Sequence, residues 1–206
     1  MLGNLTFSII LTLAGFSTYI INDNWPEITI EKQTTTVEIS IIPEKILSYA
    51  DKFFSFKELL IRSYGLSEKK AEQFADWILI STLESSLEPE TIAALIMTES
   101  SFRYKVKSHV GAVGPAQVIP FFWKSHCTGD LENDPQMNIS CGVFVLERYK
   151  KRCKGDLMCA FAMYNVGPTN FYKEKYSGAK KRYIKKINTH KNQILAFKNN
   201  NEFAIN

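Results

Sequence analysis

The first pattern along the chain is an uncharged, mostly hydrophobic run of 20 residues, from Leu2 to Ile21. It is long enough to cross a bilayer, although Asn4 and several Ser, Thr and Gly residues weaken it as a span. Its flanks lack the basic region and the small-residue cleavage site of an ordinary secretory signal. We predict that residues 1–22 are an uncleaved membrane anchor or an atypical signal, which places the rest of the chain outside the cytoplasm. A buried N-terminal helix is the alternative.

Two helical patterns follow a segment in which apolar and polar residues alternate. The alternation within residues 23–43 predicts an extended linker, with an edge strand as an option. Residues 44–86 have the spacing of two helices, and we expect the second to begin with Ser67 as its N-cap. The residues predicted to be buried on this second helix are Ala71, Phe74, Ala75 and Ile78.

A third amphipathic segment, from Leu87 to Ser100, contains a carboxylate at a position that the pattern assigns to the core. Pro89 suits the first helical turn. The buried stripe is predicted to consist of Ile92, Leu95 and Ile96, and the next position in this stripe is Glu99. Burial and the negative end of the helix dipole would both raise the pKa of this carboxyl, as a general acid requires. The alternative is that Glu99 ends the helix and faces solvent.

Composition and charge narrow the class of protein. The chain has 206 residues, of which 45% are hydrophobic and 22% charged, so it can form a core and is not disordered. The first hundred residues carry 7 Lys/Arg and 14 Asp/Glu, and the others carry 18 and 7. A basic second half favours an anionic partner such as a wall polymer, nucleic acid or lipid head groups. The basic run from Lys173 to Lys191 has the spacing of an amphipathic closing helix, so we expect no nucleic-acid partner.

The four cysteines flank two short polar segments. Cys127 and Cys141 enclose one, and Cys153 and Cys159 enclose the other. In an exported chain these residues favour disulfides, and sequential pairing gives the shortest loops of the three possible connectivities. A zinc site is disfavoured because the spacings match no common finger pattern. We therefore expect two disulfides, with neither a metal nor a cofactor.

Two more segments contain residues that could form a site together with Glu99. Residues 111–120 form a glycine-containing loop, in which Gly111 and Gly114 permit positive φ angles and close approach to a ligand. Residues 160–168 predict a helix closed by Gly-Pro, with Tyr164 and Asn165 near its end. Each pattern is common in isolation.

In this order and spacing, the segments resemble the soluble lytic transglycosylase family. The family's first motif, Glu-Ser followed by an aromatic residue, is matched by Glu99-Ser100 with Phe102, and it continues to Ser108. Its second motif, Gly-Leu-Met-Gln-Val-x-Pro, is similar to residues 114–120, where Pro-Ala replaces Leu-Met. These replacements change the lining and stiffness of the loop, but they remove no group that does chemistry.

The family's later motifs extend the resemblance to residues 85–190. Ala-Tyr-Asn-x-Gly is matched by residues 163–167, where Met163 replaces Ala, and a later Tyr-Val or Tyr-Ile pair is matched by Tyr183-Ile184. The resemblance implies a mainly α, lysozyme-like α+β fold with a sugar-binding groove. We expect this catalytic domain to occupy residues 44–198 and to be followed by a tail.

The resemblance also implies cleavage of the β-1,4 bond between N-acetylmuramic acid and N-acetylglucosamine in peptidoglycan. Hydrolysis of a glycoside ordinarily uses two carboxylates, but no Asp or Glu lies between Ser100 and Gly129. With one acid, the simplest route has Glu99 protonate the glycosidic oxygen and then accept the proton of the sugar's own C6 hydroxyl, which gives a 1,6-anhydro product. The alternatives are a hydrolytic muramidase with a remote carboxylate, such as Asp130 or Asp134, and a non-catalytic wall-binding assembly module.

The family's site residues are carried over by position. Glu99 is the expected catalytic acid, Tyr164 is expected to form a hydrogen bond near it, and Asn165 is expected to brace the junction after its helix. Ser100 either caps its helix or touches substrate. The full set of expected substrate-binding residues is Ser108, Gln117, Tyr164, Asn165, Ser100 and Tyr183. The aromatic run Phe121-Phe122-Trp123 is expected to pack the domain, with one ring in the sugar groove as the alternative.

Location and partners follow from these interpretations. The protein is expected to be exported to the periplasm or cell surface and to contact the membrane through its N-terminal segment. Its substrate partner is the peptidoglycan glycan strand. A secretion, conjugation or phage apparatus is an open option for a further partner.

Overall fold

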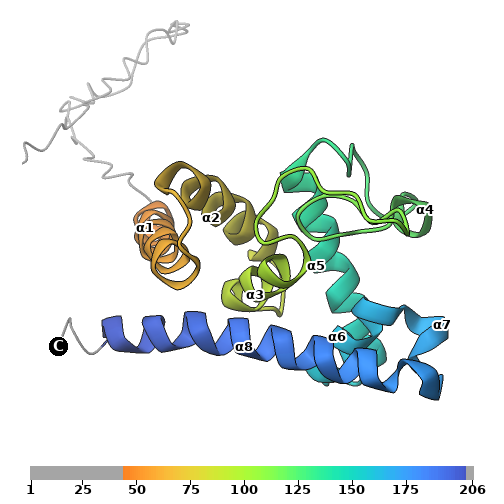
Figure 1. Cartoon of the computed structure of the whole chain (residues 1–206). Coiled ribbons are helices and arrows are strands. Elements are labelled where there is room, and N and C mark those ends of the chain that lie inside the picture. The colour runs from red at the N-terminus through yellow and green to blue at the C-terminus, as the bar shows by residue number, and fades with distance from the viewer. Residues whose placement is uncertain (1–43, 203–206) are drawn as a thin grey trace, which may run out of the picture. The chain divides into compact units, whose positions relative to one another are not determined.

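The computed structural model describes residues 44–202, with side chains for residues 49–199, as a set of packed helices (Figure 1). The predicted anchor and linker lie outside these residues. No helix within the described part is long and apolar enough to cross a membrane. The helices are α1 (Glu44–Tyr64), α2 (Glu68–Thr82), α3 (Pro89–Glu99), α4 (Pro120–Trp123), α5 (Pro135–Arg152), α6 (Leu157–Val166), α7 (Pro168–Phe171) and α8 (Ser177–Glu202), with a 3₁₀ turn at Glu174–Tyr176.

The prediction of a mainly helical fold is confirmed. Between residues 44 and 202 the only β structure is a pair of isolated bridges, Lys107 with Val113 and Val113 with Val118. These bridges lie in the loop between α3 and α4, where they hold the glycine-containing segment against itself. The β part of the expected α+β fold is therefore reduced to this loop.

Helix α2 begins after Ser67 and buries the face that the sequence predicts. Ser67 has the extended backbone of an N-cap, although its side chain makes no capping hydrogen bond. The four residues predicted to be buried on this helix are buried, together with Leu79 and Thr82. Its apolar stripe packs against α3 and α5.

Helix α3 lies at the centre of the fold. Ile92, Leu95 and Ile96 are at most 1% exposed, as predicted. Helix α8 packs along α3 and α6, while α5 packs against α2 and α6 (Figure 1). Helix α8 also continues past residue 198, the predicted end of the domain, to Glu202.

The chain turns sharply after α3, where Ser101 and Phe102 both have left-handed backbones. Phe102 has φ of 56°, yet its side chain is fully buried. Its ring lies 5.0 Å from that of Phe74 and 5.4 Å from that of Tyr64, measured between centroids. Burial of this ring offsets the strain of the left-handed backbone and directs the following loop back over α2.

The aromatic run at α4 does not pack as predicted. Phe121 and Phe122 are 77% and 61% exposed, and only Trp123 is partly buried. The Trp123 ring meets the rings of Phe144 and Tyr149 edge to face, at centroid distances of 6.1 and 5.8 Å. A single four-residue turn presents only one side to the domain, and Trp123 occupies it.

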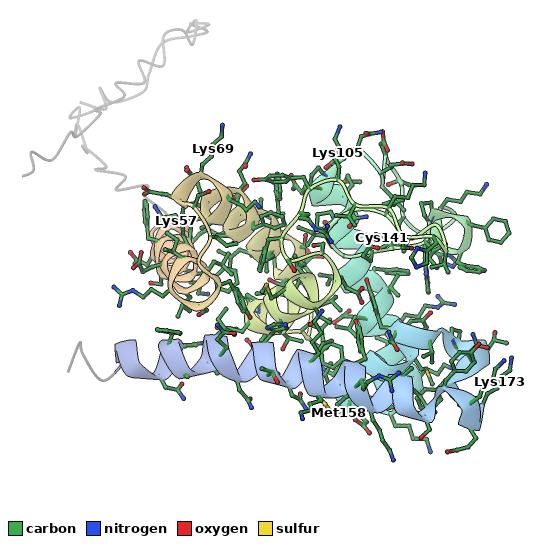
Figure 2. The ribbon with its side chains drawn as sticks, in the orientation of Figure 1. Lys57, Lys69, Lys105, Cys141, Met158 and Lys173 are labelled. Atoms are coloured by element: carbon green, nitrogen blue, oxygen red, sulfur yellow. A yellow bond between two sulfur atoms is a disulfide. The ribbon has the colours of Figure 1, made fainter. Side chains whose placement is uncertain are left out.

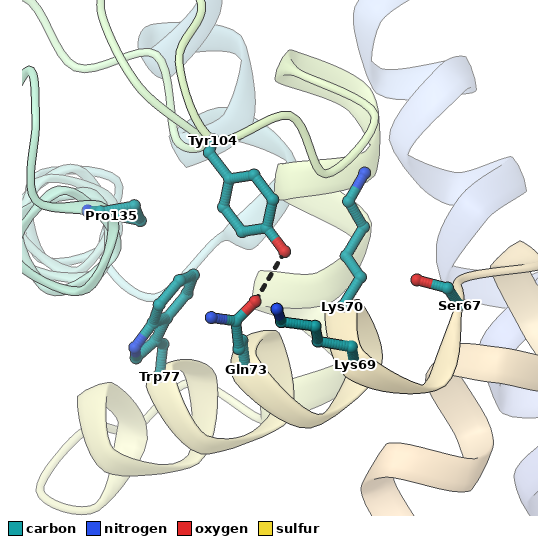
Figure 3. A pocket seen from close by; sticks show the side chains of 7 residues that line it. All are labelled: Ser67, Lys69, Lys70, Gln73, Trp77, Tyr104 and Pro135. Carbon is teal, nitrogen blue, oxygen red and sulfur yellow. Dashed lines mark hydrogen bonds between the residues drawn. The ribbon is translucent and has the colours of Figure 1, made fainter.

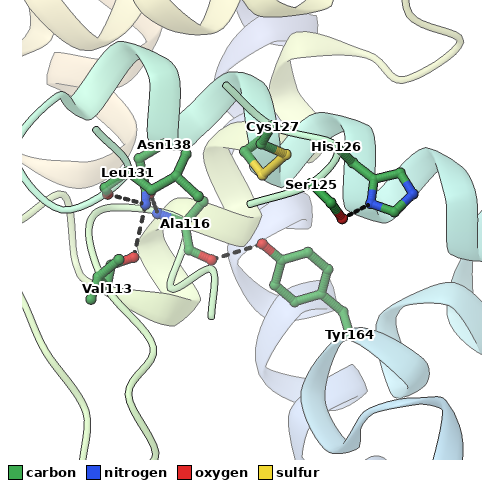
Figure 4. Close-up of a disulfide and its surroundings, with 9 residues drawn as sticks. Val113, Ala116, Ser125, His126, Cys127, Leu131, Asn138 and Tyr164 are labelled. Atoms are coloured by element: carbon green, nitrogen blue, oxygen red, sulfur yellow. Dashed lines mark hydrogen bonds between the residues drawn. A yellow bond between two sulfur atoms is a disulfide. The ribbon is translucent and has the colours of Figure 1, made fainter. Parts of the chain in front are cut away.

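Two disulfides join the expected cysteines in sequential order. Cys127–Cys141 ties the loop after α4 to α5 (Figure 4). Cys153–Cys159 ties the end of α5 to the first turn of α6. The lysines labelled in Figure 2 include Lys69, Lys105 and Lys173, which are exposed.

Candidate active site

Glu99 is the last residue of α3, and its side chain is only partly exposed. Oε1 of its carboxyl accepts a hydrogen bond from the hydroxyl of Tyr183 on α8. Tyr183 is 9% exposed, and it reaches the carboxyl because α8 packs against α3. The sequence pattern assigned this position to the core; in the structure the carboxyl lies half-buried at the end of the stripe, and α8 supplies its partner.

The environment raises the pKa of Glu99 to about 7. Burial is the largest effect, because it disfavours the charged carboxylate. The hydrogen bond from Tyr183 and the positive charge of Lys186 act in the opposite direction and lower the pKa. A carboxyl with this pKa exchanges a proton readily near neutral pH, so it can act both as an acid and as a base.

Two tyrosines near Glu99 remain neutral. Burial and the charge of Glu99 raise the pKa of Tyr183 and of Tyr164 well above the usual value. Both hydroxyls are therefore hydrogen-bond donors at any pH near neutrality. Helix α8 packs against both α3 and α6, the helices that carry Glu99 and Tyr164, and its Tyr183 bonds to Glu99.

Tyr164 forms a hydrogen bond with the glycine-containing loop and not with the carboxyl itself. Its hydroxyl donates to the backbone carbonyl of Ala116 at 2.8 Å (Figure 4). The tyrosine that bonds to Glu99 is Tyr183. Ala116 belongs to the glycine-containing loop, so Tyr164 attaches this loop to α6. Which of the two tyrosines bonds to Glu99 depends on how the helices cross, and residue spacing along the chain does not specify this crossing.

The loop between α3 and α4 is organised by Asn138, a residue that the sequence analysis did not identify. Its side chain is fully buried; it donates to the carbonyls of Val113 and Leu131 at 2.9 Å and accepts from the amide of Ala116 at 2.8 Å (Figure 4). Gly114 lies against it with φ of 70°, and a Cβ there would overlap the Asn138 amide. Asn138 is a polar residue on the buried side of α5, and this feature of the sequence could have identified it.

Gln117 and Ser108 bond within the same loop. Gln117 has φ of 52°, and its Nε2 donates to the carbonyls of Val106 at 3.2 Å and Gly114 at 2.9 Å. Oγ of Ser108 accepts from the amide of Ala112 at 3.0 Å. Both side chains therefore shape the loop.

Ser100 and Asn165 take different positions. Ser100 is 1% exposed, and its hydroxyl donates to the carbonyl of Ile96 at 3.2 Å, which completes the end of α3. Asn165 is exposed near the end of α6, and within the described residues its side chain makes no hydrogen bond. The junction after α6 is instead braced by Asn170, whose Nδ2 donates to the carbonyl of Val166 at 3.1 Å.

Comparison with known proteins identifies the family. The family model of the transglycosylase SLT domain matches residues 77–188, which is more than half of the chain. The chain belongs to the SLT family. The crystal structure of the 70 kDa soluble lytic transglycosylase from Escherichia coli matches with a TM-score of 0.53 and 20% sequence identity. The match covers 74% of this chain and 30% of that one, and it shows that the two share a fold.

The SLT domain contains one more charged group near Glu99. Nζ of Lys186 donates to the carbonyl of Thr98 at 2.9 Å, so its positive charge lies at the negative end of α3. Lys186 follows Tyr183 by three positions on α8, which places both on the side of that helix that faces α3. The three-residue spacing between Tyr183 and Lys186 is the feature of the sequence from which the position of Lys186 near Glu99 could have been predicted.

The remote carboxylates of the SLT domain serve local structure. Oδ1 of Asp130 accepts from the amides of Glu132 and Asn133 at 3.1 and 3.0 Å, and the hydrogen bonds from Asn133 are the main cause of its lowered pKa. Asp134 caps α5 by accepting from the amide of Met137 at 3.1 Å. Residues 44–202 contain no group of three or more His, Cys, Asp or Glu arranged to hold a metal ion.

Proposed function

We propose that this SLT-family protein is a peptidoglycan lytic transglycosylase. It cleaves the β-1,4 bond between N-acetylmuramic acid and N-acetylglucosamine and leaves a 1,6-anhydro-muramoyl end. The observation that carries the proposal is the position of Glu99, a carboxyl with a raised pKa held by a tyrosine hydroxyl at the end of a buried helix. Membership of the SLT family supports the substrate class.

In the first step, protonated Glu99 donates its proton to the glycosidic oxygen, and the bond from that oxygen to C1 of the muramoyl unit breaks. A pKa of about 7 keeps a large share of Glu99 protonated near neutral pH, which supports this role. The Tyr183 hydrogen bond fixes the direction of the carboxyl before substrate arrives.

In the second step, the Glu99 carboxylate takes the proton of the C6 hydroxyl while that oxygen forms a bond to C1. The acid is regenerated and no water is consumed. The Tyr183 hydroxyl and the charge of Lys186 both favour the carboxylate, so they stabilise Glu99 in the state between the two steps. One carboxyl thus serves both steps, and the local roles of Asp130 and Asp134 fit this mechanism.

The remaining predicted site residues have supporting roles in this proposal. Gln117 and Ser108 hold the loop that borders the site, and substrate can displace their internal hydrogen bonds. Tyr164 stays uncharged and fixes that loop to α6 through its hydrogen bond to Ala116. Ser100 stabilises the C-terminal end of α3 by donating to the carbonyl of Ile96. Asn165 is exposed and available to a sugar.

Mass spectrometry of a peptidoglycan digest in H₂¹⁸O tests the reaction. A lytic transglycosylase gives an anhydro product without ¹⁸O, one water lighter than a hydrolytic product. A product labelled with ¹⁸O would show a muramidase instead, and the absence of any product would favour a non-catalytic wall-binding module.

A matched variant tests the role of Glu99 in the same assay. Glu99→Gln keeps the shape of the side chain but can neither donate nor accept the proton. General acid–base help is typically worth ~10²–10⁴-fold, so the rate should fall by at least that factor while circular dichroism stays native. A variant that keeps more than about a tenth of the rate would remove Glu99 from the mechanism.

The proposal also concerns location. Peptidoglycan lies outside the cytoplasmic membrane, and two disulfides are typical of exported proteins. We therefore place the enzyme in the periplasm or at the cell surface, with residues 1–22 as its signal or membrane anchor. Cell fractionation of the full chain and of a chain lacking residues 1–22 separates an anchored from a released protein.

A further inference from the structure

A groove outside the Glu99 site lies between α2 and the loop that follows α3. Its volume is about 560 Å³. The seven residues that line it are Ser67, Lys69, Lys70, Gln73, Trp77, Tyr104 and Pro135 (Figure 3). None of them belongs to the set around Glu99, so the proposed reaction gives this groove no role.

Two aromatic rings form the apolar wall of the groove. Trp77 and Tyr104 meet edge to face with centroids 6.0 Å apart, and both are partly exposed. The fully buried ring of Phe74 supports both, at 5.2 Å from Trp77 and 5.3 Å from Tyr104. Figure 3 shows these two rings and Pro135 around one space. Rings held in this way present a fixed apolar surface to a ligand.

Three nitrogen donors line the groove: the Gln73 amide and the ammonium groups of Lys69 and Lys70. The hydroxyl of Tyr104 donates to Oε1 of Gln73 at 2.8 Å, which fixes the amide, and the amide nitrogen makes no hydrogen bond within the described residues. Nζ of Lys70 lies 5.5 Å from the centroid of the Tyr104 ring, and Lys69 is exposed beside it. A wall of rings with an amide and two ammonium groups is suited to a ligand that combines apolar faces with negative charge.

The charge of the groove is positive. No carboxylate is among its lining residues, and the neighbouring Glu68 is paired with Lys57 at 3.0 Å. A second groove, of about 430 Å³, offers a comparison. It lies along the outer face of α8 and is also lined by two lysines, Lys181 and Lys185, but by no aromatic side chain.

We propose that the groove between α2 and Tyr104 is a second binding site for peptidoglycan, separate from the site of cleavage. This inference rests on the proposed function. Trp77 and Tyr104 contact the apolar face of a sugar, and Lys69 and Lys70 bind carboxylates of the acidic stem peptides that muramic acid units carry. The charges of polymer and groove are complementary. Two sites on one domain increase the local concentration of the polymer at Glu99.

Binding of the full chain to insoluble sacculi tests the inference. The Glu99→Gln background prevents degradation during co-sedimentation. The double change Lys69→Gln with Lys70→Gln should weaken binding about three- to tenfold, as expected for two exposed ion pairs. The matched control, Lys181→Gln with Lys185→Gln, changes the net charge equally and should leave binding nearly unchanged. Equal losses in both pairs would reduce the effect to overall charge and overturn the inference.

Two further measurements separate the parts of the site. Trp77→Leu removes the indole and should also weaken binding, and circular dichroism confirms that the variant is folded. Sacculi whose carboxyl groups have been converted to neutral amides should bind the wild-type protein and the Lys69/Lys70 variant equally. A persisting difference between these proteins on neutral sacculi would exclude carboxylates as the ligand of the lysines.

Turnover distinguishes a failure of this inference from a failure of the proposed function. In a chain with Glu99 intact, the Lys69/Lys70 variant should cleave a soluble muramoyl tetrasaccharide at the wild-type rate and sacculi more slowly. Unchanged cleavage and binding of sacculi would overturn the second site alone. A wild-type protein that cleaves neither substrate would overturn the proposed reaction, while the binding comparison would still decide the second site.

Discussion

Tyr183 donates its hydroxyl hydrogen to Oε1 of Glu99 although the two residues lie 84 positions apart in the sequence. They meet because α8 packs along α3. The tyrosine hydroxyl favours the charged carboxylate, whereas burial favours the neutral acid, and burial is the larger effect. The pKa of Glu99 is therefore set jointly by the end of one helix and the side of another.

Tyr183→Phe should change both the rate and its pH dependence. The hydrogen bond from Tyr183 lowers the pKa of Glu99 in the wild-type protein. The change keeps the ring but removes this bond, so the pKa of Glu99 should rise above about 7. A reaction that begins with the protonated acid loses rate as the pH rises through this pKa, so the alkaline limb of the pH–rate profile should move to higher pH. The maximal rate should fall ~10–100-fold, the equivalent of one hydrogen bond to a charged group. A profile unchanged in position and height would contradict this role.

Lys186→Met should also move the alkaline limb to higher pH, because the positive charge of Lys186 lowers the pKa of Glu99. The shift should be smaller than for Tyr183→Phe, since solvent screens an exposed ammonium group. Lys185→Met is the matched control: it removes the same charge from the adjacent position, which lines the outer groove of α8. Lys186→Arg should restore the wild-type profile. Equal shifts in Lys186→Met and Lys185→Met would assign the effect to net charge alone.

Glu99→Gln should stabilise the fold at alkaline pH. The pKa of Glu99 is about 7 in the folded protein and 4.5 as the reference for the unfolded chain, so the folded state binds more protons between these values. The contribution of Glu99 to stability therefore falls as the pH rises from about 4.5 to 7, by up to about 3 kcal/mol. Urea unfolding of both proteins at pH 4 and pH 8 measures this. A stability difference between the two proteins that is the same at both pH values would show that the pKa of Glu99 is not raised.

Asn138→Ala should destabilise the domain by about 2–4 kcal/mol, because it leaves buried polar groups in the loop around Ala116 without partners. Asn133→Ala is the control, since that side chain is exposed and bonds only to Asp130 among the described residues. It should change stability by less than about 0.5 kcal/mol. Thermal unfolding of the three proteins measures both effects, and equal melting temperatures for all three would contradict the role of Asn138.

The sequence by itself determined the features that depend on neighbours along the chain. The 3.6-residue period identified the buried faces of α2 and α3 and placed Glu99 at the end of the stripe formed by Ile92, Leu95 and Ile96. The short polar segments between cysteines predicted the pairing Cys127–Cys141 and Cys153–Cys159. The ordered motifs indicated the SLT family. In each case the informative residues lie within a few turns of one another, where helix geometry or loop length restricts the outcome.

The tertiary structure alone decided which distant groups touch. Tyr183 contacts Glu99, and Tyr164 contacts Ala116, because helix packing sets the angles between α3, α6 and α8. The exposure of Phe121 follows from the short length of α4, which leaves only one side against the domain. Side-chain packing between helices decides these outcomes, since several arrangements bury the same apolar stripes and differ only in which polar groups meet across them.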